Sequence, residues 1–392
     1  MLQLAIDKLR AETPGCQNVL HFNNAGAALP PNVVIEAVKQ HLDLEAAIGG
    51  YEAAEQEQSK IEHIYDAAAK LINCNREEIA FVENATRAWD MAFYGMKFKE
   101  GDHILTAQAE YASNYLAFLH IAKQKGVVID IIDNDSYGQL DIHDLEKKLT
   151  DNVKLIAITH VPTQGGLINP IVEVGEIANK YNIPYLVDTT QSIGQMPVDV
   201  QEIGCDFLCA TGRKFMRGPR GTGFLYAKKS TWPQFEPPFI DLHSAKWIAD
   251  NQYEIRQDAC RFETWEQNIA AKIGLGVAID YILQLGIDAI WERIQHLANQ
   301  LRQKLQEIPS VTLQDLGKNK CGIVTFTSSK INASELKKEL IKRKINVSIS
   351  ITEYARLDLV KRNVPSLIRV SVHYYNTEDE IVRFCSEIQS IC

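Results

Sequence analysis

The sequence predicts an α/β protein with a large domain, built on a mainly parallel sheet covered by helices, and a smaller α+β C-terminal domain. Three observations support this prediction. The chain has 392 residues, which is more than one compact core usually holds. Residues from about 30 to 250 alternate between short apolar runs and amphipathic stretches, and the pattern then changes. Nearly continuous apolar strands separated by helices are typical of a parallel sheet that is buried on both faces.

Strand and helix patterns alternate in the first part of the chain. Strands are expected at 78–82, 104–106, 127–132, 155–159, 185–187, 207–209 and 223–226. Helical spacing of apolar residues follows some of these strands, at 84–93, 111–122 and 172–181. This alternation indicates the layered α/β domain.

The rest of the chain has a different pattern. Residues 233–255 contain Pro237-Pro238 and scattered aromatic residues, and we expect a partly irregular connection there. Beyond it the sequence predicts helices at 270–285 (interrupted by Gly-Leu-Gly), 290–305 and 333–344, and strands at 322–326 and 367–371. A last helix is expected to start at Thr377, which forms a Thr-x-x-Glu capping box with Glu380.

These patterns predict a division of the chain into two domains and an arm. Residues 1–20 are expected to form an N-terminal arm that belongs to the small domain. Residues 21–255 would form the large domain, and residues 256–392 the small C-terminal α+β domain.

The charge and composition exclude several classes of partner. The net charge is −9, so the chain offers no general attraction to nucleic acid or to anionic membranes. Residues 1–10 lack a signal-peptide pattern, and no uncharged apolar run approaches the ~18 residues of a membrane span. The eight cysteines are scattered without a CxxC pair, which is typical of reduced packing thiols. We therefore expect a cytoplasmic protein with no metal site.

Polar groups stand where several predicted strands end, which is where α/β sheets bind ligands. Asn84-Ala-Thr86 opens a helix, whose free N–H groups favour a phosphate. Glu110-Tyr111, Asp188 and Thr211-Gly-Arg-Lys214 follow three other strands. Each has a simpler interpretation: a helix cap at Asn84 and Thr86, a turn cap at Asp188, a solvated charge at Lys214.

The joint placement of these groups favours a pyridoxal 5′-phosphate (PLP) site. A lysine forms a Schiff base with the aldehyde of PLP. A buried carboxylate such as Asp188 keeps the pyridine nitrogen protonated, so that the ring withdraws electrons from the substrate α-carbon. The phosphate needs backbone N–H groups, hydroxyls and a cation.

The motifs that carry these groups resemble those of the class V aminotransferases of PLP fold type I, also called the cysteine desulfurase-like family. The resemblance extends from the segment 21–26 to the segment 367–371. Its most specific part is Val-Asp-Thr-Thr-Gln-Ser at 187–192, followed by Ala-Thr-Gly-Arg-Lys-Phe at 210–215 and the glycine-rich segment 218–226.

The resemblance implies a role for each of several residues. Lys214 would hold PLP and move the α-proton of the substrate. Asp188 would pair with the pyridinium, Gln191 would lie near the ring oxygen, and Thr163 would contact the cofactor face or the substrate. Arg369 would grip the substrate α-carboxylate, since its planar fork suits bidentate binding; a surface charge is the alternative.

The same resemblance assigns the remaining cofactor contacts. Ala85 and Thr86 match the phosphate-binding turn, Thr211 and Arg213 match further phosphate contacts, and Tyr111 takes the place of the ring that stacks on PLP. The family builds its site across a two-fold interface, so a homodimer is expected.

Three departures from the family pattern bear on the reaction. The loop before Arg369, where desulfurases carry a nucleophilic cysteine, contains none between residues 346 and 365, and Tyr111 replaces their histidine. Trp265-Glu266 stand where a Gly-Thr pair reaches the phosphate across the dimer. Because Glu266 would repel a phosphate unless an arginine paired with it, Glu266 is a candidate for contacting substrate instead.

These departures resemble the subgroup of isopenicillin N epimerase-like proteins and the C–S lyase of ergothioneine assembly. The sequence therefore predicts a PLP enzyme that acts on a small amino acid through an external aldimine and α-proton abstraction. C–S lyase (β-elimination from a cysteine conjugate) or aminotransferase activity is favoured. An epimerase, or a catalytically silent PLP-fold binding protein, is the alternative. Further candidates for the substrate pocket, each with a packing or surface role as its alternative, are Asn23, Asn24, Trp265 and Arg356.

Overall fold

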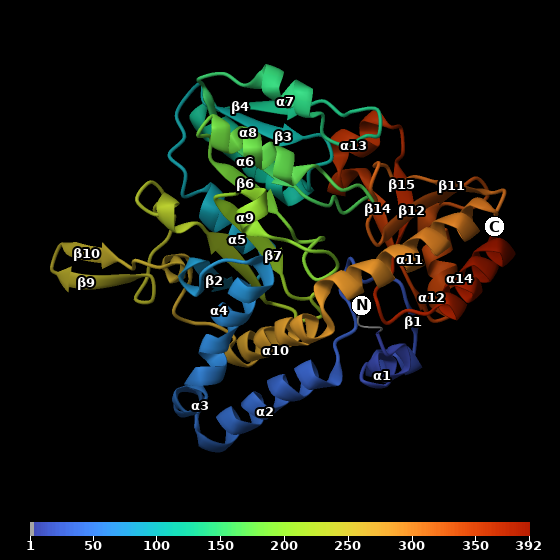
Figure 1. The fold of residues 1–392 in the computed structure, drawn as a ribbon, viewed down its shortest axis with the longest axis horizontal. Helices are drawn as coiled ribbons and strands as arrows, with labels where there is room; N and C mark the ends of the chain where they lie inside the picture. The colour runs from blue at the N-terminus through green and yellow to red at the C-terminus, as the bar shows by residue number, and fades with distance from the viewer. Residues whose placement is uncertain (1–3) are drawn as a thin grey trace.

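A computed structural model describes residues 4–392 (Figure 1). Its large sheet has seven strands in the order β2-β8-β7-β6-β5-β3-β4. The strands are β2 (Ile79–Val82), β3 (His103–Ala107), β4 (Val128–Ile132), β5 (Val153–Thr159), β6 (Tyr185–Asp188), β7 (Phe207–Thr211) and β8 (Gly223–Ala227). Strand β8 is antiparallel to both neighbours and every other pairing is parallel, which confirms the predicted mainly parallel sheet.

Alternate residues of the central strands enter two separate cores, one on each face of the sheet. Ile156 and Ile158 of β5 belong to one hydrophobic cluster, whereas Leu155 and Ala157 belong to the other. Side chains of successive strand residues point to opposite faces, so a strand that is apolar throughout must be covered on both sides. This explains the continuous apolar runs in the sequence.

Helices cover the two faces and connect the strands. They are α2 (Asn32–Ile48), α3 (Gly50–Gln56), α4 (Gln58–Ile72), α5 (Ala85–Phe93), α6 (Ala112–Lys125), α7 (Ile142–Lys148), α8 (Ile171–Lys180) and α9 (Val200–Ile203). Helix α5 packs against β7 and β8, and α4 packs against β2.

A second, four-stranded antiparallel sheet lies at the other end of the molecule (Figure 1). Its order is β11 (Val311–Leu313), β12 (Ile323–Ser328), β15 (Ser366–Ser371) and β14 (Ser348–Ile351). The helices of this region are α11 (Ile287–Gln306), α12 (Ala333–Lys342), α13 (Arg356–Lys361) and α14 (Glu378–Ile391). Thr377 and Glu380 form the capping box predicted at the start of α14.

The N-terminal arm contacts this C-terminal region. After α1 (Ile6–Ala11), strand β1 (Leu20–His21) pairs in parallel with β13 (Ile345–Asn346). In contrast, α10 (Ile269–Leu285) packs against α4 and α2, within the part of the chain assigned to the large domain. The proposed domain boundary at 255/256 therefore stays a prediction.

Two local expectations differ from the structure. Helix α10 continues through the Gly-Leu-Gly segment, where a Cβ on Gly274 would lie 2.6 Å from Val38 Cγ2 and 2.8 Å from Pro219 Cγ. The glycine therefore serves close packing and does not break the helix. The connection expected to be partly irregular contains a hairpin of β9 (Ala245–Ala249) and β10 (Gln252–Ile255), which projects from the body in Figure 1. Most of its residues are exposed, so the usual buried-strand pattern is missing.

Among residues 4–392, no single helix is long and apolar enough to cross a membrane; the pair α10–α11, bent by 80°, meets that criterion only when the two helices are taken together.

Candidate active site

A cavity of about 500 Å³ lies at the carboxyl ends of the strands of the large sheet, and most of the predicted cofactor residues line it. The strands end there because parallel strands place their carboxyl ends along one edge of the sheet. The predicted residues that line the cavity are Ala85, Thr86, Tyr111, Thr163, Asp188, Gln191, Arg213 and Lys214. The structure thus brings together residues that lie up to 129 positions apart in the sequence (214 − 85).

Lys214 follows β7 and is buried, with 8% of its surface exposed. Burial holds the pKa of its amine well below the usual value, and the nearby charges of Arg213 and Arg369 lower this pKa further. Asp188 acts in the opposite direction but does not outweigh them. Lowering the pKa of a lysine favours its neutral amine, which is the form that reacts with an aldehyde.

Asp188 is the last residue of β6 and is held by two donors. Its Oδ1 accepts a hydrogen bond of 2.8 Å from Thr190 N, and its Oδ2 accepts one of 3.0 Å from Asn114 Nδ2. These bonds fix the orientation of a carboxylate that is 5% exposed. This is the geometry required of a fixed anion facing a cation in the cavity.

Asn114 was not predicted, and it connects Asp188 to a second buried carboxylate. Asn114 Nδ2 also donates to Glu110 Oε1 over 2.9 Å. Glu110 further accepts hydrogen bonds from the Thr159 hydroxyl and from Tyr111 N, the latter at 2.7 Å. Burial raises the pKa of Glu110 to about 7 although these donors oppose the rise. The signal in the sequence was the i, i+4 spacing of Glu110 and Asn114 at the start of a helix.

The phosphate end of the predicted site lies at the N-terminus of α5. Asn84 caps the helix by accepting a hydrogen bond from Arg87 N (2.9 Å). The first N–H groups of a helix have no partner within the helix, so those of Ala85 and Thr86 are available to an anion. Arg213 Nη1 donates to Thr211 Oγ1 (3.0 Å). Arg213 thus places a cation in the same cavity, whereas Thr211 does not line it.

Thr163 and Gln191 also line the cavity, and Arg369 lies beside it, bonded to Thr163 but outside the cavity lining. Gln191 Nε2 donates to Thr163 Oγ1 over 3.1 Å, and Arg369 Nη1 donates to the carbonyl oxygen of Thr163 over 3.2 Å. Burial lowers the pKa of Arg369 to about 10. Within the described part of the chain, Arg369 has no carboxylate in ion-pair distance, and its Nε is buried without a partner.

The residues present fit PLP. Gln191 Oε1, Thr190 Oγ1 and Arg369 Nε are buried polar atoms without a hydrogen-bond partner in residues 4–392, and all three belong to residues in or beside the cavity. Native proteins rarely leave such atoms unpaired, so their clustering indicates a polar ligand. The anion-binding helix end, the fixed carboxylate and the neutral amine match the phosphate, the pyridine nitrogen and the aldehyde of PLP.

Two predicted substrate residues lie away from this cavity. The Asn24 amide is buried in a packing network, where Nδ2 donates to Ser371 O over 2.7 Å and Oδ1 accepts from the Tyr375 hydroxyl. This network ties the segment just after β1 to the end of β15. Glu266 is exposed and does not line the cavity. Of the further candidates, Trp265 is 58% exposed and Arg356 is exposed at the start of α13.

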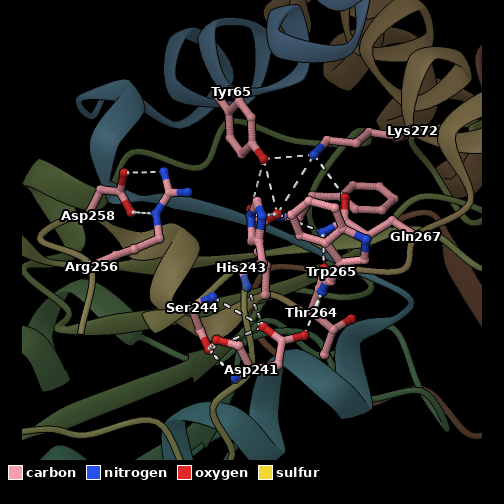
Figure 2. A network of polar contacts seen from close by, with 12 residues as sticks. Tyr65, Asp241, His243, Ser244, Arg256, Asp258, Thr264, Trp265, Gln267 and Lys272 are labelled. Carbon is pink, nitrogen blue, oxygen red and sulfur yellow. Dashed lines mark hydrogen bonds and ion pairs between the residues drawn. The ribbon is translucent and has the colours of Figure 1, made fainter. Parts of the chain in front are cut away.

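The segment that carries Trp265 and Glu266 is anchored by the buried carboxylate of Glu263. Glu263 Oε1 accepts hydrogen bonds from Tyr65 OH (2.9 Å) and Phe81 N (2.8 Å), and Lys272 Nζ lies 3.7 Å from Oε2. Trp265 N donates to Asp241 Oδ2 over 2.7 Å (Figure 2). These bonds hold the start of the segment while its aromatic tip faces outward.

Glu263 also lies close to His243 and Cys260, and ligand atoms of the three residues are within 4.8 Å of one another. The carboxylate, however, is already hydrogen-bonded and has the Lys272 ammonium beside it. Burial alone would raise the pKa of Glu263, but Lys272 and the neighbouring donors hold it at about 2. An ammonium in this position repels a cation, so the cluster is an ion-pair anchor and not a metal site.

No cysteine lines the main cavity in the described residues. Seven of the eight thiols have a pKa raised mainly by burial. Cys209, next to Asp188, is buried and its pKa is well above the usual value. A nucleophilic cysteine needs the opposite shift.

Comparisons with known proteins bear on the whole chain. The family model for aminotransferase class V matches residues 19–384. A probable cysteine desulfurase of Pyrococcus abyssi is 32% identical, over 98% of this chain and 97% of the relative. The apo structure of a cysteine desulfurase from Thermococcus onnurineus NA1 is 28% identical, with a TM-score of 0.91 and coverage of 100% and 99%.

More distant structures share the fold. The complex between the cystine C–S lyase C-DES and its reaction product cysteine persulfide has a TM-score of 0.87 at 22% identity, with coverage of 96% and 99%. Another C-DES structure holds glycine covalently linked to its PLP cofactor. These likenesses confirm the predicted PLP fold type I.

Proposed function

We propose a reaction for this chain, which belongs to the class V aminotransferase family and is therefore a PLP-dependent enzyme. The reaction is cleavage of the C–S bond of a cysteine derivative by β-elimination. One observation carries the proposal: among the described residues, the cavity combines a buried lysine of lowered pKa with a fixed carboxylate and has no thiol in its lining, and a buried arginine without a carboxylate partner is bonded to its Thr163. PLP, when bound, withdraws electrons from the α-carbon of an amino acid.

The cavity residues would hold PLP at three points. Asp188 would accept a hydrogen bond from the pyridine nitrogen, and its fixed orientation keeps that nitrogen protonated. The N–H groups of Ala85 and Thr86, together with Arg213 and the Thr211 behind it, would bind the phosphate. Tyr111 would cover one face of the ring, and Gln191 and Thr163 would contact its polar edge.

Lys214 would serve as the covalent anchor of PLP and as the base. Burial and the nearby arginine charges lower the pKa of its amine, which favours the neutral form that can take the α-proton of the substrate. Arg369 would bind the α-carboxylate and so orient the α-C–H bond toward Lys214. The buried guanidinium without a carboxylate partner in residues 4–392 supports this role, because an unpaired buried charge is costly unless a ligand pairs with it.

The absence of a thiol from the cavity lining distinguishes elimination from persulfide transfer. Relatives about one-third identical are named as probable cysteine desulfurases, which favours a sulfur-containing substrate. Here the sulfur would leave as a thiol: the α-C–H and β-C–S bonds break, and hydrolysis releases pyruvate and ammonia. The likeness to the C–S lyase subgroup supports the same outcome.

A panel of substrates tests the proposal. S-substituted cysteines should yield equal amounts of pyruvate, ammonia and thiol, and cystine should yield cysteine persulfide in place of the thiol. Lys214→Ala should yield none of these products and should lose the covalently held cofactor. Amino transfer to a keto acid would indicate an aminotransferase instead, and inversion at the α-carbon an epimerase. Bound cofactor without any product would identify a silent binding protein. Any of these three results would refute β-elimination.

We further propose a homodimer. The projecting hairpin exposes Trp247 (72%) and Tyr253 (55%), and nearby Leu242 is 76% exposed. Exposed aromatic residues on a two-stranded hairpin are typical of a protein interface. Light scattering that shows an active monomer would contradict the proposal. The cytoplasmic location stays a prediction.

A further inference from the structure

Arg217 lies three residues after Lys214 and is buried, with 1% of its surface exposed. Its guanidinium donates from all three nitrogens: Nε to Leu29 O (2.8 Å), Nη2 to Thr13 Oγ1 (2.6 Å) and Nη1 to the Tyr374 hydroxyl. Every acceptor is neutral, and no carboxylate in residues 4–392 pairs with it. The side chain therefore joins the Lys214 loop to the N-terminal arm and to the C-terminal region.

Aromatic rings replace the missing counter-ion. The Cζ atom of Arg217 lies 4.5 Å from the centroid of the Tyr375 ring and 5.2 Å from that of Tyr374. A guanidinium over the face of a buried aromatic ring is attracted by the ring's negative face. The Tyr374 and Tyr375 rings thus stabilise the Arg217 guanidinium in place of a carboxylate.

The backbone at Arg217 is constrained as well. Its φ is +59°, a left-handed conformation that a residue with a Cβ adopts at a cost. Arg217 N donates to Lys214 O over 2.9 Å, which closes a turn directly after the lysine. The buried side-chain bonds hold this turn in place.

A second contact joins the loop that carries Lys214 to residues 373–376, the motif that contains Tyr374 and Tyr375. His373 Nε2 lies 3.0 Å from Phe215 O, and the His373 ring stacks on Tyr375 with centroids 5.1 Å apart. The motif 373–376 begins two residues after β15 ends, and β15 carries Arg369. The two groups proposed to contact the reacting amino acid are therefore connected through one rigid set of contacts.

We infer that Arg217 is a positioning residue that fixes the spacing between Lys214 and Arg369 by clamping the Lys214 loop to the 373–376 motif. This inference rests on the proposed roles of Lys214 and Arg369. Such a clamp affects how the bound amino acid is oriented, because Arg369 would hold its carboxylate while Lys214 would act at its α-carbon. It does not touch the reacting atoms itself.

The test compares Arg217→Lys with a matched control, Arg302→Lys. Arg302 is also buried and donates four hydrogen bonds, to Asp315 Oδ2 (2.6 Å), Cys321 O (2.8 Å), Ile323 O (2.9 Å) and Asn299 Oδ1 (3.5 Å), but it has no bond to the Lys214 loop. Both substitutions keep the charge and lose the planar fork. Melting temperature measures their structural cost, and glycine binding, followed by the visible absorbance of the PLP-loaded protein, measures the site.

In Arg217→Lys, we expect the dissociation constant of glycine to rise about tenfold, as for loss of one charge-assisted hydrogen bond. The pKa seen in the absorbance of the Lys214-bound cofactor should move upward, because a protonated nitrogen that moves away from the positive charges of Arg369 and Arg213 becomes easier to protonate. In Arg302→Lys, both quantities should stay within about twofold of wild type. Equal behaviour of the two variants would overturn the inference.

Two further measurements separate the possible failures. If Arg217→Lys does not fold, Tyr374→Phe takes its place, because it removes one hydrogen-bond acceptor of Arg217 and keeps the aromatic ring. Tyr374→Phe should then weaken glycine binding and raise the absorbance pKa, as expected for Arg217→Lys. No change in either quantity would overturn the inference. Borohydride reduction of the wild type followed by peptide mass analysis locates the cofactor. Attachment anywhere other than Lys214 would instead refute the proposed function.

Discussion

Asn114 bridges two buried carboxylates, and its removal tests whether that bridge prepares the cofactor site. Asn114→Ala deletes the bonds from Nδ2 to Asp188 Oδ2 (3.0 Å) and to Glu110 Oε1 (2.9 Å). A hydrogen bond to a charged acceptor is worth about 1.5–3 kcal/mol. Because Glu110 has a pKa of about 7 and is partly protonated at neutral pH, we expect a loss of about 2–4 kcal/mol in the free energy of unfolding.

The same substitution should weaken PLP binding. Without Asn114, the Asp188 carboxylate keeps only one of the two donors that fix its orientation, so it is held less firmly toward the pyridinium. We expect the dissociation constant of PLP to rise at least about tenfold, which corresponds to about 1.4 kcal/mol. Absorbance titration of the apo protein measures binding, and urea unfolding monitored by circular dichroism measures stability.

A matched control isolates the charged acceptors. Asn179 Nδ2 also donates two hydrogen bonds, to Gly175 O (2.8 Å) and Gly204 O (3.0 Å), but both acceptors are neutral and lie outside the cavity. Asn179→Ala should cost about 1 kcal/mol per bond or less and leave PLP binding unchanged. If Asn114→Ala binds PLP as tightly as Asn179→Ala does, the bridge has no part in the cofactor site.

Three further predictions follow from single residues. Glu110 has a folded pKa of about 7 against an ordinary value of 4.5, so its contribution to stability is present below pH 4.5 and is lost as the pH rises through about 7. Glu110→Gln should flatten this part of the curve of unfolding free energy against pH, and an unchanged curve would contradict the assigned pKa. Arg369→Gln should raise KM for the amino acid about 10- to 100-fold while cofactor absorbance persists, because a charge-assisted bond to the carboxylate is lost; steady-state kinetics with an unaltered KM would argue against carboxylate binding. Gly194→Ala should destabilise the protein by more than about 1 kcal/mol in thermal unfolding, because φ is +85° and a Cβ would lie 2.5 Å from Phe215 C; a melting temperature equal to wild type would show that the loop can shift.

Much of the fold follows from local patterns. Strands buried on both faces appear as apolar runs, and their alternation with helices leaves few possible arrangements, so the parallel sheet was predicted correctly. The hairpin at 245–255 was missed because its residues are mostly exposed and carry no burial pattern. The continuous α10 was missed because the reason for Gly274 lies in Val38 and Pro219, which are distant in sequence.

The sequence by itself determined the chemistry of the site. Lys214, Asp188 and the turn at 84–86 stand at strand ends, and residue type with position in the sheet is enough to predict a PLP enzyme. The tertiary structure decided which residues surround them. It placed Asn24 in a packing network and Glu266 on the surface, brought Asn114 to Asp188, and buried Arg217 against two tyrosines. The physical reason is that burial, desolvation and hydrogen-bond partners depend on segments far apart in the chain, which no local pattern of residues records.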